Sequence, residues 1–185
     1  MSDRKTAEGL PAALGGLAGG RRLFSAPDEP GPGLSAAVPG SVGRQRAAVV
    51  AEARSWVKTP YHHLGDVKGA GVDCAMLLVR VFVDLGVVPP FDPRPYPPDW
   101  HLHRSDERYL GFVLERGRRV ETPREGDIMV LRYGRAYAHG GIVTRLAPLT
   151  IVHAFQPYRL VLEEAVHGNP EIARRAGAAV FASLW

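Results

Sequence analysis

The sequence predicts one α+β domain in which helices come first and an antiparallel β-sheet follows. Two segments before Val87 carry apolar residues at the spacing of a helix that buries one face. Several short runs after Gly126 are rich in β-branched and apolar residues, which is typical of strands. Helices that precede a group of strands, instead of alternating with them, favour an α+β domain with an antiparallel sheet.

An irregular arm is expected over residues 1–43, with the folded domain over residues 44–185. The stretch from Gly15 to Gly43 is rich in Gly, Pro, Ala and Ser, and runs such as Asp28–Gly33 cannot hold a helix or a central strand. A flexible arm is the simpler interpretation. The alternative is an anchor that becomes ordered on a partner.

The expected helices are Arg44–Val57, which Thr59–Pro60 ends, then Asp73–Leu85, then a short helix over Ser105–Leu114. A glycine-punctuated loop over Leu64–Gly71 and a proline-dense, irregular loop over Val87–Trp100 separate them. The expected strands are Asp127–Arg132, Gly140–Thr144, Thr150–Phe155 and Leu160–Ala165, with Ala178–Trp185 as a candidate closing strand.

Composition excludes several kinds of site and partner. The 185 residues include one cysteine, so neither an intrachain disulfide nor a multi-cysteine zinc site can form. A net charge of +4 is mild; it suits an anionic polymer such as a cell wall and equally suits an ordinary soluble protein. The basic run Arg116–Arg119 has no interleaved aromatic residues, so we expect no nucleic-acid partner.

Neither a membrane span nor a signal peptide is expected. No stretch is long and apolar enough to cross a bilayer, and no apolar segment follows the charged residues 1–7. His62–His63 is interpreted as a pair of loop histidines. His101–Leu102–His103 has a spacing that could chelate zinc but lacks supporting ligands. We therefore expect neither a metal nor a cofactor.

Cys74 is a candidate nucleophile because it follows Asp73 and opens an amphipathic helix. Asp73 is a suitable cap for that helix. Unpaired N–H groups and the positive end of the helix dipole favour a thiolate there, and the same N–H groups could hold an oxyanion. The alternative is that this lone cysteine is a small buried hydrophobe.

Two histidines mirror one another across a predicted hairpin. Folding the chain about Leu146 places His139 opposite His153, and directly opposed residues point to the same face. The alternative is two unrelated histidines, since one slip of register would separate them. Gly140 and Gly141 would leave space for a substrate peptide beside His139.

Five fragments, in order and spacing, resemble the NlpC/P60 family of cysteine peptidases over about residues 45–165. They are Thr59-Pro60-Tyr61, Asp73-Cys74, Glu125-Gly126-Asp127-Ile128, Ala138-His139-Gly140-Gly141-Ile142-Val143 and Val152-His153-Ala154. The resemblance implies a papain-like fold, in which a helix that carries the cysteine packs on an antiparallel sheet that carries the histidines. It implies that Cys74 is the nucleophile, that His139 is the general base and that His153 orients His139. Tyr61 and Asp73 match positions that line the family's substrate pocket, and Gly140 is a further candidate for substrate binding.

The resemblance also implies the substrate, which is the stem peptide of bacterial peptidoglycan. The segment Tyr96–Trp100, with Arg104 and Glu107–Leu110, is similar to a branch of the family found in phage tails. We therefore expect a location in the tail of a phage or phage-like particle, after synthesis in the bacterial cytoplasm. The arm would contact other tail or tail-tip proteins.

The sequence departs from the family pattern after the cysteine, where Ala75 and Met76 replace the usual Ser and Gly. The departure leaves the nucleophile and base in place but leaves the bond that is cleaved open. It also motivates two alternatives: a catalytically degenerate tail-tip or wall-binding module, and another papain-like thiol amidase.

Overall fold

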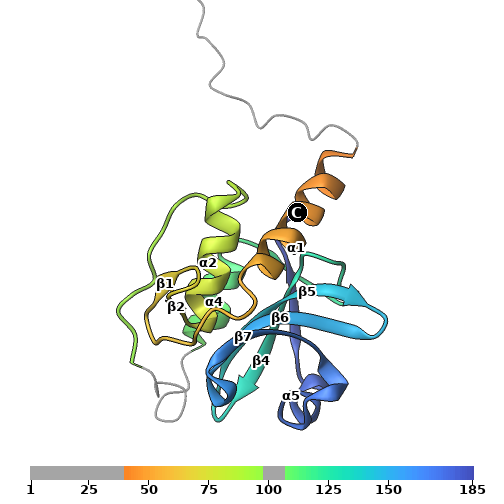
Figure 1. Ribbon diagram of the computed structural model, residues 1–185. Coiled ribbons are helices and arrows are strands. Elements are labelled where there is room, and N and C mark those ends of the chain that lie inside the picture. Colours follow the sequence, from red (N-terminus) through yellow and green to blue (C-terminus); the bar gives the residue numbers. More distant parts are fainter. Residues whose placement is uncertain (1–39, 98–106) are drawn as a thin grey trace, which may run out of the picture. The chain divides into compact units, whose positions relative to one another are not determined.

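The structure is a computed structural model, and it describes residues 40–97 and 107–185. Within these residues the main element is a six-stranded antiparallel sheet with the strand order β3-β8-β4-β5-β6-β7 (Figure 1). The strands are β3 (Arg118–Val120), β4 (Ile128–Tyr133), β5 (Ala136–Leu146), β6 (Leu149–Phe155), β7 (Leu160–Ala165) and β8 (Val180–Ser183). A separate pair joins β1 (Asp66–Val67) to β2 (Gly71–Val72).

The described helices are α1 (Ser41–Ser55), α2 (Cys74–Asp84), α4 (Arg108–Leu114) and α5 (Pro170–Ala176), with short 3-10 turns η1 (Gln156–Tyr158) and η2 (Val166–Gly168). Figure 1 shows α1, α2 and α4 gathered on one side of the sheet and α5 apart from them. The predicted α+β class with an antiparallel sheet is confirmed. No helix in residues 40–97 and 107–185 is both long and apolar enough to cross a membrane.

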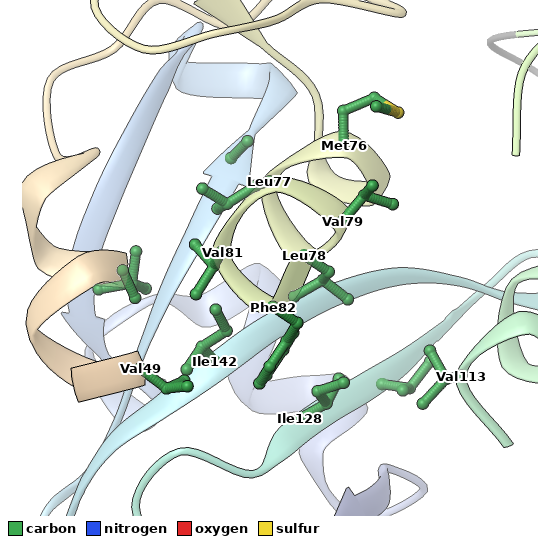
Figure 2. Close-up of a cluster of buried hydrophobic side chains, with 14 of the residues drawn as sticks. Val49, Met76, Leu77, Leu78, Val79, Val81, Phe82, Val113, Ile128 and Ile142 are labelled. Carbon is green, nitrogen blue, oxygen red and sulfur yellow. The ribbon is translucent and has the colours of Figure 1, made fainter. Parts of the chain in front are cut away.

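Alternating side chains along the strands build two apolar layers, one on each face of the sheet. Ile128, Ile142 and Val152 pack with the buried face of α2, where Leu77 and Val81 are fully buried (Figure 2). Their strand neighbours Met129, Val143 and Ile151 pack on the other face with Ile172 of α5. Helix α2 is therefore held on one face of the sheet, and α5 covers the other.

Most predicted elements are present, with shifted ends. Strand β7 has the predicted bounds, and α2 lies within the predicted Asp73–Leu85. Helix α1 begins at Ser41 instead of Arg44, directly after Gly40, whose φ of 93° is left-handed. The prediction of an arm over residues 1–43 otherwise lies outside the described residues, as do residues 105–106 of the predicted short helix.

Some elements were not predicted. Strand β8 was expected to close the sheet, but it lies inside it, between β3 and β4. Strand β3 and helix α5 were missed, and the expected Leu64–Gly71 loop contains β1 and the start of β2. Helix α5 carried a readable signal: Asn169 caps it by accepting hydrogen bonds from the N–H groups of Glu171 and Ile172, and Pro170 occupies the first turn.

A β-bulge at Thr144 sets the register of the β5–β6 hairpin. A two-residue turn brings Leu146 opposite Leu149, and the pairing then skips Thr144, so that Val143 lies opposite Ile151. The Thr144 hydroxyl donates to Glu163 Oε1 at 2.7 Å. Arg54 donates to both Glu163 Oε1 (2.8 Å) and the Thr144 carbonyl (3.3 Å), which ties the bulge to α1.

We expect Thr144→Val to lower the free energy of unfolding by about 1–2 kcal/mol, because it removes a hydrogen bond from a buried hydroxyl without changing the side-chain shape. Urea denaturation would measure this loss. Thr122→Val is the matched control, because Thr122 is exposed; it should change stability by less than about 0.5 kcal/mol. Equal stability of the two variants would contradict a structural role for the bulge.

Candidate active site

Cys74 is the first residue of α2, as predicted, and Asp73 is its cap. Asp73 has an extended backbone, and its Oδ1 accepts hydrogen bonds from the N–H groups of Ala75 at 3.2 Å and Met76 at 2.9 Å. Asp73 is 1% exposed, so this cap is buried at the base of the site. The cap orients the first turn of the helix and with it the cysteine.

The same cap limits the N–H groups that could hold an oxyanion. Ala75 and Met76 donate to the Asp73 side chain, and the Leu77 N–H donates to the Asp73 carbonyl at 2.9 Å. Of the first four N–H groups of α2, only that of Cys74 is left for a ligand. The expectation that several helix-terminal N–H groups are available is therefore wrong, because the capping carboxylate already takes two of them.

The Cys74 sulfur lies against the backbone of β5, on both sides of His139. The β5–β6 ladder ends at the pair Ile142–Val152. Beyond it, the Cys74 thiol is 3.9 Å from the Ala138 carbonyl oxygen, and the Gly140 N–H lies near enough to the sulfur to lower the pKa of the thiol. The end of the ladder thus gives the cysteine access to the backbone of the strand that carries His139.

The thiol is not prepared as a thiolate. Burial, followed by the Asp73 charge, raises the pKa of Cys74 to about 12, and the nearby Gly140 N–H, Tyr109 hydroxyl and Cys74 N–H only partly oppose this. The prediction of a thiolate stabilised by the helix terminus is wrong for the unliganded site. The reason is that loss of solvent and the adjacent Asp73 carboxylate outweigh the favourable groups.

His139 and His153 form a direct pair, with His139 Nε2 2.8 Å from His153 Nδ1. His139 is 8% exposed and His153 is fully buried. The predicted register is wrong by two residues: continuing the observed pairing past Ile142–Val152 sets Gly141, not His139, beside His153. A shift of two preserves the face, so the histidines are diagonal neighbours on the same side of the sheet.

Glu164 completes this group and was not predicted. Its Oε1 lies 2.9 Å from His153 Nε2 and also accepts from Asn169 Nδ2 at 2.7 Å. The hydrogen bond from His153, above all, holds the pKa of Glu164 below its usual value, so the group is a carboxylate that can only accept. His153 Nε2 must therefore carry a proton.

These contacts determine where the remaining protons lie when both rings are neutral. With a proton on Nε2, the Nδ1 atom of His153 carries a lone pair and accepts from His139 Nε2–H. The Nδ1 atom of His139 is then left with a lone pair. Burial, with smaller contributions from His153 and Arg175, lowers the pKa of His139 well below its usual value, so the ring stays neutral and keeps this lone pair.

A cavity of about 540 Å³ brings the predicted residues together. Tyr61, Asp73, Cys74 and His139 all line it, and His153 lies behind His139. Its walls come from both faces of the sheet: α2 and α4 contribute on one side, and β4, β6 and α5 on the other. The lining residues outside the predicted set include Tyr96, Tyr109, Phe112, Tyr133, Phe155 and Glu171.

Gly140 faces a protein side chain instead of open space. A Cβ atom added there would lie 2.5 Å from the Tyr109 hydroxyl oxygen. Tyr109 also donates to the Cys74 carbonyl oxygen at 3.1 Å. The predicted space for a substrate above Gly140 is therefore occupied by Tyr109, and what Gly140 offers the site is its N–H toward the sulfur. Its predicted role in substrate binding stays a prediction.

The proline-dense loop forms one wall of the cavity through Pro93, Tyr96 and Pro97. The Tyr96 hydroxyl is 2.9 Å from both oxygens of the Asp73 carboxylate. His63 Nε2 contacts the Tyr96 carbonyl oxygen at 3.0 Å, which ties the loop to the preceding segment. This wall was not assigned from the sequence, because only folding brings the loop onto the cap of α2.

His63 lies on the cavity, and its nearest carboxylate already has other partners. It is 3.6 Å from Asp73 Oδ2, which is already occupied by the Leu64 N–H and Tyr96. Within residues 40–97 and 107–185 there is no group of three or more residues that could hold a metal ion. His101 and His103 lie outside the described residues.

We expect Asp73→Asn to lower the pKa of Cys74, because the Asp73 charge raises it while an Asn oxygen can still cap the helix. The pH dependence of iodoacetamide alkylation reports this pKa directly, since Cys74 is the only cysteine. Asp84→Asn, at the other end of α2, is the matched control and should leave the alkylation midpoint unchanged. An unshifted midpoint in Asp73→Asn would disprove the proposed electrostatic effect.

Comparisons with known proteins found matches among solved structures alone. The sequence matches no protein-family model and no curated protein. The chain is similar to the NlpC/p60 domain of the peptidoglycan hydrolase SagA, with 23% identity, a TM-score of 0.49, and coverage of 74% of this chain and 96% of that one. It is also similar to an N-acetylmuramoyl-L-alanine amidase from Bacteroides uniformis, with 11% identity, a TM-score of 0.47, and coverage of 76% and 98%.

Proposed function

We propose that this protein is a thiol peptidase that hydrolyses amide bonds in the stem peptides of bacterial peptidoglycan. The observation that carries the proposal is the chain of contacts from Glu164 through His153 to His139, which leaves a lone pair on His139 Nδ1. A neutral, buried histidine and the only cysteine line the same cavity, which supports a thiol hydrolase, since that chemistry needs a nucleophile and a base at one site. The resemblance of the sequence to the NlpC/P60 family supplies the substrate.

In the first step, His139 Nδ1 takes the proton of the Cys74 thiol as the sulfur attacks the carbonyl carbon of the scissile amide. Burial raises the pKa of Cys74 and lowers that of His139, so a resting thiolate–imidazolium pair is disfavoured. The proton therefore moves during the attack, as in general base catalysis, and not before it.

The oxyanion that forms would accept hydrogen bonds from the Cys74 N–H and from the Tyr61 hydroxyl, which also lines the cavity. Burial and the Cys74 and Asp73 charges raise the pKa of Tyr61, so its hydroxyl stays protonated and can donate. The imidazolium of His139 then gives its proton to the leaving nitrogen, and the C–N bond breaks. Water, deprotonated by His139, hydrolyses the thioester and restores the thiol.

The expected setting is the tail of a phage or phage-like particle, where an enzyme reaches the wall as part of the particle. The similarity of Tyr96–Trp100 and Glu107–Leu110 to that branch of the family supports this placement. Residues 1–43 would contact other tail or tail-tip proteins. Mass spectrometry of purified particles from the host would detect the protein if the placement is right.

A non-catalytic wall-binding module is the second candidate, and the chemistry of the first turn of α2 favours it. Ala75, in place of the family's Ser, lines the cavity without a polar group, and Met76 is buried in the core. The raised pKa of Cys74 is also compatible with a thiol that does no chemistry. Another thiol amidase remains a third candidate, since Ala75 alters the surface that would meet the substrate.

Digestion of purified peptidoglycan separates these candidates. We expect wild-type protein to release stem-peptide fragments, which mass spectrometry would identify together with the cleaved bond. Cys74→Ala and His139→Gln should each lower the rate by at least about 10³-fold, because each removes an essential group of one catalytic unit. Release of the same fragments by Cys74→Ala would overturn the mechanism. Binding to the wall without cleavage by wild type would favour the structural module.

The pH dependence of activity should reflect the buried base. Because burial holds the pKa of His139 well below its usual value, His139 stays unprotonated as the pH falls through about 6.5, where an ordinary imidazole becomes charged. The acid limb of kcat/KM should therefore lie below pH ~6.5. His167→Gln removes an exposed histidine and should leave the profile unchanged. An acid limb above that pH would show that His139 is not the buried base described.

A further inference from the structure

We infer that Glu164 is a positioning residue that sets the tautomers of both histidines and so keeps His139 competent as a base. The inference rests on the proposed function for its catalytic consequence. Its structural core, the control of proton positions in a buried histidine pair, can be measured without any activity.

The three residues form one diagonal line across three adjacent strands. His139 lies on β5, His153 on β6 and Glu164 on β7. His153 is paired with Leu162, so Glu164, two residues further along β7, points to the same face as His153. The two contacts, 2.8 Å from His139 Nε2 to His153 Nδ1 and 2.9 Å from His153 Nε2 to Glu164 Oε1, connect them in series.

Glu164, at one end of this line, determines which nitrogen of His139, at the other end, carries the proton. A neutral imidazole carries one proton on either nitrogen. Without an acceptor at its Nε2, His153 could carry its proton on Nδ1 and donate it to His139 Nε2. His139 would then hold its own proton on Nδ1, the nitrogen that the mechanism requires as a base. The Glu164 carboxylate excludes this arrangement by accepting from His153 Nε2.

The carboxylate is itself held in place. Asn169 Nδ2 donates to the same Oε1 atom at 2.7 Å, while Asn169 Oδ1 caps α5. Asn169 is 2% exposed and the Glu164 side chain is 23% exposed, whereas His153 is fully buried. Glu164 therefore joins the buried histidine pair to the cap of α5. Because its side chain is partly exposed, water can reach its other carboxylate oxygen, Oε2.

The direct test compares wild type, Glu164→Leu and Glu164→Gln by long-range ¹H–¹⁵N NMR of proteins labelled with ¹⁵N-histidine. We expect both histidines to carry their proton on Nε2 in wild type. Glu164→Gln keeps an oxygen that can accept from His153, so it should keep this pattern. Glu164→Leu removes the acceptor and should shift His153 toward the Nδ1–H tautomer. If Glu164→Leu does not fold, Glu164→Ala makes the same test with a smaller side chain.

Activity on peptidoglycan provides the second readout. We expect Glu164→Leu to lower kcat about 10- to 100-fold with little change in KM, since a group that orients a catalytic histidine acts on the chemical step. Glu164→Gln should recover most of that loss. Glu115→Leu, which replaces an exposed glutamate at the end of α4, controls for loss of a surface carboxylate and should match wild type.

The two hypotheses fail in different ways. Wild-type tautomers in Glu164→Leu would overturn the role of Glu164, whatever the protein does to peptidoglycan. Inactivity of wild type on every wall preparation would count against the proposed function, but the NMR comparison would still decide whether Glu164 controls the histidine pair.

Discussion

The site depends on the alternation of side chains along a strand, because His139 and His153 must point to the same face of the sheet. One extra residue in β5 makes this possible. Counted from the two-residue turn, with Leu146 opposite Leu149, a regular hairpin would place His139 and His153 on opposite faces of the sheet. The bulge at Thr144 changes the count by one and returns both rings to the same face. The contact between His139 and His153 follows from that single unpaired residue, while the contact between His153 and Glu164 follows from the regular pairing of β6 with β7.

Helix α1 holds the bulge, although α1 is far from Thr144 in the sequence. Arg54 binds the Thr144 carbonyl oxygen and the Glu163 carboxylate, and Glu163 accepts from the Thr144 hydroxyl. Glu163 and Glu164 are neighbours on β7 and point to opposite faces. One glutamate secures the bulge that aligns the histidines, while the next contacts His153. Two adjacent residues of an edge strand thus support the same pair from the two faces of the sheet.

Burial is the second determinant, and it acts on Cys74 and His139 together. It raises the pKa of Cys74 and lowers the pKa of His139, so both effects keep these two side chains uncharged in the resting site. Asp73 strengthens the effect on the thiol while it caps α2 and holds Tyr96. Because this buried carboxylate lies close to the sulfur, it disfavours deprotonation of Cys74 in the unliganded site. A bound substrate would have to change the surroundings of the thiol before a thiolate could form.

The sequence allowed correct prediction where a local pattern sufficed. Apolar periodicity and the Asp73 cap located α2, and short apolar runs located β7 with its observed bounds. The register of the hairpin was predicted wrongly, because a bulge leaves no mark in composition and the turn could be centred at more than one residue. Glu164 could not be chosen over Glu163, because the register between β6 and β7 decides which glutamate shares the face of His153. The thiol pKa was predicted in the wrong direction, since burial depends on packing between distant segments.

The segment that delivers Tyr61 to the cavity also pairs with the start of β7, which is one of the two edge strands of the sheet. Lys58, Thr59 and Tyr61 hydrogen-bond the backbone of Arg159 and Val161 at the start of β7, whose other side pairs with β6. An uncovered edge strand is a template on which other chains can add. If this segment detaches, the cavity loses a wall, and the backbone groups at the start of β7 become free to pair with another chain. Loss of the cavity wall and self-association would therefore begin with the same local opening.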